Sequence, residues 1–141
     1  MKYDDASWHY GGDFPDDLPD EAGAIHIGMF ITWALLVELG GSIHLEDFPE
    51  ELAKLRSREV TPAQFFLQAC DEKFTDEDLN EEGNAFTQYY YQPDDAQYLE
   101  DYDMILGENL PSVYHVADTW DNFELLKPIL DERFNSWRRT T

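Results

Sequence analysis

The feature that most constrains the fold is the apolar run AGAIHIGMFITWALLVELGG at residues 22–41. Two acidic residues precede it, which favours the start of a helix, and the two glycines at its end favour a helix stop. A helix that is apolar on nearly every side is buried in the middle of a globule. A membrane-spanning helix needs roughly 20 apolar residues, whereas the apolar part of this run, from Ala22 to Val37, is shorter and contains His26 and Thr32. We therefore predict a buried central helix at residues 22–39.

Several other segments carry apolar residues at the three- and four-residue spacing of a one-sided helix. Thr61-Pro62 with Gln64 has the pattern of a helix start with a capping box. We predict a mostly α-helical, single compact domain over residues 1–141, with five or six helices around the central one. Residues 1–19 are expected to form an ordered N-terminal loop. One or two very short strands are compatible with the loose alternation near residues 43–47 and 110–118.

Length and cysteine content limit how the domain is stabilised. A chain of 141 residues is the size of one domain and buries enough surface to fold without cross-links. Its single cysteine, Cys70, excludes an intramolecular disulfide and suits a reducing compartment. The start of the chain has no apolar run that would act as a signal peptide. These features predict a cytoplasmic protein.

The charge of the chain restricts its partners. There are 31 acidic residues and 9 Lys or Arg, a net charge of −22. Nucleic acids and anionic membranes are bound through cationic groups, so both are disfavoured as partners. A basic protein would instead be attracted, by steering that salt weakens. The excess is concentrated in residues 71–108, which contain 13 acids and one base.

The segment QYYYQPDDAQYLEDYD, residues 88–103, combines five tyrosines with five carboxylates. Tyr98 and Tyr102 share a helical face with other apolar residues, so they are expected to lie on the core. The turn near Pro93 and the remaining acids are expected to be exposed. We predict that this rim binds a basic partner through Tyr91, Asp94, Asp95, Glu100, Asp101 and Asp103.

No spacing in the chain predicts catalysis, a metal or a cofactor. The four histidines are scattered, with no pair placed to put two ligands on one helix face. The nearest match to a calcium loop, residues 76–87, lacks the required glycine and the closing glutamate. Cys70 has apolar neighbours and no basic ones, which is typical of a core residue. The most enzyme-like arrangement would pair His26 or His115 with Asp118.

Three stretches, SWHYGGDFPDDLPDEAG, AIHIGMFITWALL and YHVADTWDNFELLKPILDERF, resemble a family of small acidic bacterial proteins of unknown function. The resemblance covers nearly the full chain. It implies no established activity, cofactor or catalytic residue.

Three functional hypotheses follow. The first is an acidic cytoplasmic protein that docks a basic protein partner, such as an immunity protein or a nucleic-acid mimic. The second is a housekeeping acidic domain without a dedicated partner. The third is a small enzyme using His26, His115 and Asp118, which would require a pocket that brings these residues together.

Overall fold

The computed structural model describes residues 2–9, 14–93 and 97–140, and it confirms a mostly α-helical fold. The α-helices of these residues are α1 (Ile25–Leu36), α2 (Pro49–Arg56), α3 (Pro62–Ala69), α4 (Glu81–Tyr90), α5 (Gln97–Tyr102) and α6 (Trp120–Thr140). Short 3₁₀ and π turns join them: η1 (Ala6–His9), η2 (Asp20–Ala24), η3 (Ile43–Asp47), η4 (Asp76–Asp78), η5 (Asp103–Gly107) and η6 (Val113–His115). None of these helices is both long enough and apolar enough to cross a membrane.

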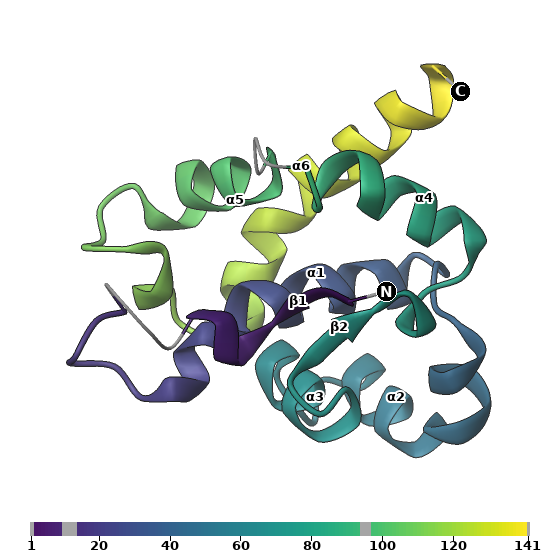
Figure 1. The fold of residues 1–141 in the computed structure, drawn as a ribbon, viewed down its shortest axis with the longest axis horizontal. Helices are drawn as coiled ribbons and strands as arrows, with labels where there is room; N and C mark the ends of the chain where they lie inside the picture. The colour runs from purple at the N-terminus through teal and green to yellow at the C-terminus, as the bar shows by residue number, and fades with distance from the viewer. Residues whose placement is uncertain (1, 10–13, 94–96, 141) are drawn as a thin grey trace.

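Helix α1 forms the centre of the molecule. In Figure 1 it crosses the middle, with α2 and α3 below it and α4 and α5 above it. Every residue from His26 to Leu35 is buried, as the apolar run predicts. The helix is shorter than the predicted span of residues 22–39, because residues 20–24 form the 3₁₀ turn η2. It ends before Glu38, whose φ of 68° lies in the left-handed region.

Helix α3 packs very closely against α1. A Cβ atom on Gly28 of α1 would lie 2.6 Å from the carbonyl oxygen of Pro62, so only glycine allows this approach. The predicted capping box fixes where α3 begins: the Thr61 hydroxyl accepts from the Gln64 backbone N–H at 3.3 Å. The Thr61 backbone N–H donates in turn to the Gln64 side chain at 2.9 Å.

The prediction of an ordered loop for residues 1–19 is only partly correct, because this segment contains a strand. Strand β1 (Lys2–Asp5) pairs antiparallel with β2 (Lys73–Thr75), with Asp4 opposite Phe74. This pairing joins segments about seventy residues apart, so no local sequence pattern predicts it. Its consequence is that Asp4 and Asp5 are held in buried positions.

The two regions with loose alternation are not strands. Residues 43–47 form the π turn η3, and residues 113–115 form the 3₁₀ turn η6. Alternation over so few residues does not distinguish a strand from a short turn of helix.

We expect the backbone amides of residues 28–36 to exchange with solvent more slowly than those of any other element. Exposing the amides of α1 to water requires the whole core to unfold, whereas an element with one solvent-exposed face can unfold locally. Hydrogen exchange followed by mass spectrometry or NMR measures this. Helix α2, with only Leu52 and Leu55 buried, is the internal reference. Equal protection of α1 and α2 would contradict the central role of α1.

Candidate functional site

The acidic rim predicted from sequence is only partly an exposed surface. Glu100 and Asp103 are exposed, as predicted. Asp94 and Asp95 lie outside the described residues. Asp101 and Tyr91 do not lie on the open surface, and for these two the predicted exposure is wrong.

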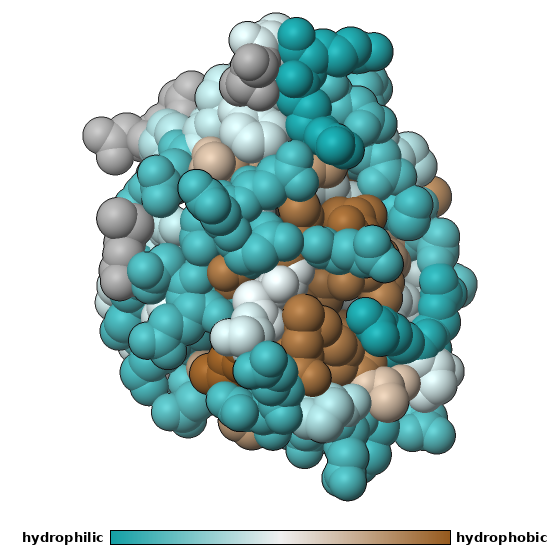
Figure 2. Space-filling model, turned by 90° about the vertical axis from the view of Figure 1, so that its right-hand side faces the viewer, coloured by the Kyte–Doolittle hydropathy of each residue, from teal (hydrophilic) through white to brown (hydrophobic). Residues whose placement is uncertain are grey.

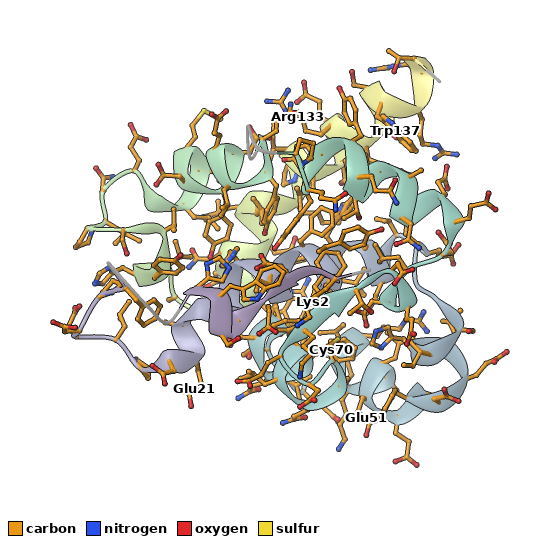
Figure 3. The ribbon with its side chains drawn as sticks, viewed as in Figure 1. Lys2, Glu21, Glu51, Cys70, Arg133 and Trp137 are labelled. Atoms are coloured by element: carbon orange, nitrogen blue, oxygen red, sulfur yellow. The ribbon has the colours of Figure 1, made fainter. Side chains whose placement is uncertain are left out.

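Asp101 is an internal anchor between helices. It is 4% exposed and accepts a hydrogen bond from the Tyr90 hydroxyl at 2.6 Å. Arg133 of α6 donates to both of its carboxylate oxygens, at 3.0 and 3.1 Å. Figure 3 shows Arg133 at the top of the molecule, beside α5. Asp101 lies three residues after the buried Tyr98 on α5, so the two side chains share one helical face.

Tyr91 is likewise committed to the interior. Its ring stacks on that of Tyr98, with centroids 5.0 Å apart, and its hydroxyl donates to the Asp4 carboxylate at 2.5 Å. Burial first, and then the negative charge of Asp4, raise the pKa of Tyr91 well above its ordinary value. Most tyrosines of this segment therefore belong to the hydrophobic core, whereas the side chain of Tyr89 is 54% exposed.

Next to the exposed acids lies a groove with mixed lining. Its volume is about 540 Å³. The residues that line it come from η5 and the segment after it: Asp103, Met104, Gly107, Glu108, Leu110, Pro111, Ser112 and Val113. Met104 and Leu110 are 58% and 39% exposed. The groove thus combines carboxylates with accessible apolar side chains, and no basic residue is among those that line it.

Another face also exposes apolar side chains. Figure 2 shows an apolar area surrounded by hydrophilic residues on the right-hand side of the molecule as drawn in Figure 1. At the end of α1, Leu35, Gly40 and Leu45 line a pocket of about 180 Å³ together with Glu38 and Arg56. Because one acid and one base line this pocket, its charge selects neither a basic nor an acidic partner.

Two histidines that are scattered in sequence meet in a polar cluster with Asp4. His9 of η1 places Nε2 2.9 Å from Asp4 Oδ1, and His26 of α1 places Nε2 3.5 Å from Asp4 Oδ2. The two imidazole rings are 4.6 Å apart between centroids and nearly perpendicular. Tyr114 contacts His9 through its hydroxyl, 2.8 Å from Nδ1. The cluster is therefore built from β1, η1, α1 and η6.

The electrostatics of this cluster favour an ionised carboxylate beside neutral imidazole. Burial alone would raise the pKa of Asp4, but its interactions with His26 and His9 outweigh burial and hold that pKa far below 3.8. Burial lowers the pKa of His26, against the opposing effect of Asp4. Within the described part of the chain, His26 Nε2 is buried without a hydrogen-bond partner.

A second cluster joins His44, Cys70 and Asp78. His44 Nε2 lies 2.8 Å from Asp78 Oδ1 and 3.8 Å from Cys70 Sγ. Figure 3 places Cys70 near β2 and α3. Burial and the neighbouring Asp78 raise the pKa of the thiol well above its ordinary value. Cys70 is thus a protonated, buried thiol rather than an activated nucleophile, in agreement with its apolar sequence context.

His26, His115 and Asp118 do not form one site. A pocket of about 390 Å³ is lined by His115 and Asp118, whereas His26 belongs to the Asp4 cluster. Asp118 accepts hydrogen bonds from the Thr61 hydroxyl and from the Ala63 backbone N–H, so it caps the start of α3. His115 contacts Asp17 at 3.0 Å and Ser112 at 2.9 Å. These hydrogen bonds give Asp118 a structural role. The three residues that the enzyme hypothesis requires do not line one pocket.

Sequence reasoning missed the importance of Asp4, His9, His44 and Asp78. In each cluster one histidine, His26 or His44, comes from an element separate in the chain from the other two donors, so the spacing of the donors follows no motif. The signals available were weaker: a histidine inside the apolar run, and an aspartate at the third position of a capping pattern after Thr75.

Comparison with known families matches one model, a domain of unknown function (DUF7832), to residues 2–116. The match includes β1, α1 and both histidine clusters, and α6 lies beyond it. Comparisons with curated proteins and with solved structures returned no match. Since the model covers well over half of the sequence, this chain belongs to the DUF7832 family, whose function is unknown.

Proposed function

We propose that this protein is an acidic binding protein that docks a basic segment of a partner protein in the groove formed by η5 and residues 110–113. The observation that carries the proposal is the meeting of exposed carboxylates and exposed apolar side chains in that groove. A bacterial cytoplasmic immunity protein or a nucleic-acid mimic would act in this way. A housekeeping acidic domain is the alternative.

The carboxylates of the groove supply attraction and orientation. Asp103 and Glu108 line it, and Glu100 lies one helical turn before Asp103 on the exposed side of α5. Complementary charge raises the association rate and selects against partners of the wrong sign. A Lys or Arg side chain entering between Asp103 and Glu108 would find acceptors on both sides.

The apolar residues of the groove, Met104 and Leu110, add hydrophobic binding free energy to the electrostatic attraction. Burying Met104 and Leu110 removes apolar area from water, at about 25 cal/mol per Å². A partner segment with a basic residue beside an aliphatic one satisfies both parts of the groove. A purely polycationic chain satisfies only the first.

We expect reversal of the groove acids, Asp103→Lys with Glu108→Lys, to weaken binding of a fluorescent peptide of alternating lysine and leucine at least tenfold. The variant replaces attraction by repulsion at the docking point, while both residues are exposed and their substitution costs little stability. Fluorescence anisotropy at 0.1 M salt, where the Debye length is about 10 Å, measures the affinity.

The matched control is Glu46→Lys with Asp47→Lys. These acids are exposed on η3, on the other side of the molecule in Figure 1, and their reversal changes net charge by the same amount. The control should change affinity less than twofold. Equal losses in the two variants would mean that only general charge attracts the peptide. That outcome would favour the housekeeping domain, as would a wild-type protein that does not bind.

A further inference from the structure

Three metal-binding atoms converge where β1, η1 and α1 meet. Asp4, His9 and His26 each present one donor, and these atoms lie within 4.8 Å of one another. The arrangement is independent of the acidic groove, since none of the three lines it. His26 is 2% exposed, and its unpartnered Nε2 is the atom that faces Asp4. A buried polar atom without a partner is costly and calls for an explanation.

The separations of these donors suit a small divalent ion. Ligands about 2.0–2.2 Å from a metal lie about 3 Å apart in octahedral geometry and somewhat farther apart in tetrahedral geometry. His9 Nε2 lies 2.9 Å from Asp4 Oδ1, and His26 Nε2 lies 3.5 Å from the other carboxylate oxygen, Asp4 Oδ2. We propose that Asp4, His9 and His26 form a binding site for a divalent first-row transition metal of the Zn²⁺ type. Two imidazoles and one carboxylate leave further coordination positions for water.

Two of the three ligands, Asp4 and His26, have pKa shifts in the direction that metal binding requires. Metal ligation requires neutral imidazole and ionised carboxylate. The pKa of His26 is lowered chiefly by burial, and that of Asp4 is held low by the two histidines despite burial.

Two tyrosine hydroxyls contact the proposed ligands and fix their orientation. The Tyr91 hydroxyl donates to Asp4 Oδ2, and the Tyr114 hydroxyl lies 2.8 Å from His9 Nδ1. In metal sites the second nitrogen of a ligating histidine is usually held by such a partner, which fixes the tautomer. With a metal on Nε2, His9 would carry its proton on Nδ1 and donate it to the Tyr114 oxygen.

The His44 cluster fits an ion less well. There the unpartnered ring nitrogen is Nδ1 of His44, whereas Nε2 is the one that faces the other donors; in the Asp4 cluster the unpartnered nitrogen, His26 Nε2, itself faces the carboxylate. Its third donor is a thiol whose pKa is raised by burial and by Asp78. We therefore assign the site to Asp4, His9 and His26.

The test is calorimetric titration of Zn²⁺ into chelator-treated full-length protein. Excess Mg²⁺ and 0.15 M salt suppress diffuse binding to the net charge of −22. We expect one saturable equivalent and a rise in the melting temperature. His9→Gln should weaken binding at least tenfold, because a direct ligand is lost. The matched variant His115→Gln, which removes a histidine paired with Asp17, should bind as wild type.

Cobalt spectroscopy of the wild-type protein separates the two clusters, because only the second cluster contains a thiol. Co²⁺ at the proposed site should show ligand-field bands without thiolate-to-metal charge transfer, and Cys70→Ser should leave the spectrum unchanged. Absence of a stoichiometric Zn²⁺ site overturns the inference. So does a folded His9→Gln protein that binds as tightly as wild type, or a thiolate band lost in Cys70→Ser. None of these outcomes bears on peptide binding at the groove.

Discussion

Phe30→Ala should lower the free energy of unfolding by about 3–5 kcal/mol, the range for removing a fully buried phenylalanine. Phe30 is 0% exposed and lies at the centre of the aromatic core. Its ring contacts those of Trp33, Phe74, Phe86, Tyr90, Tyr91 and Tyr98. The contacts reach from α1 to β2, α4 and α5, so the cavity would open where these elements meet. Because the neighbours are rigid rings, the site cannot collapse to fill it.

Urea denaturation followed by far-UV circular dichroism measures this loss. Tyr89→Ala is the matched control, since it truncates an aromatic ring of the neighbouring helix that is 54% exposed. Its expected cost is within about 1 kcal/mol, because little buried area is lost. Similar costs for both substitutions would mean that Phe30 is not the centre of the core.

Much of this core could be predicted from sequence because its signals are local. The apolar run identified α1, and Thr61-Pro62 with Gln64 identified the start of α3 to the residue. Periodicity also placed Tyr98 and Tyr102 on the core side of α5. Each signal lies within one continuous segment of the chain, where helical geometry decides which side chains share a face.

What failed depends on contacts between distant segments. Strand β1 exists because β2 lies beside it, and nothing in Lys2–Asp5 announces this partner. The cluster of Asp4, His9 and His26 depends on the same pairing, which carries Asp4 to the start of α1. The acids of the segment at residues 88–103 are predicted to be exposed because they fall largely away from its apolar face; Asp101 is an exception because it pairs with an arginine on α6.

That exception leads to the second large effect: Asp101→Ala should cost about 2–3 kcal/mol of stability. The substitution leaves the buried Tyr90 hydroxyl without its acceptor, which alone costs about 1–3 kcal/mol. It also removes both hydrogen bonds of Arg133, whose side chain is 39% exposed and can turn toward water, so this part is small. Chemical denaturation measures the loss, with Glu100→Ala, exposed on the same helix, expected within about 0.5 kcal/mol.

A double-mutant cycle with Tyr90→Phe tests the reason for that cost. If the orphaned hydroxyl dominates, Tyr90→Phe with Asp101→Ala should be clearly less destabilised than the sum of the single variants. Additive costs would mean that the loss comes from the contact between Asp101 and Arg133 of α6 instead. Helix α6 lies beyond the family match, and Trp33 of α1 also binds it, by donating to Asp131 at 2.9 Å. In either case, reversing Asp101 perturbs the fold together with the surface charge. Binding experiments on the acidic face must therefore use Asp103 and Glu108, whose carboxylates carry charge to solvent without holding helices together.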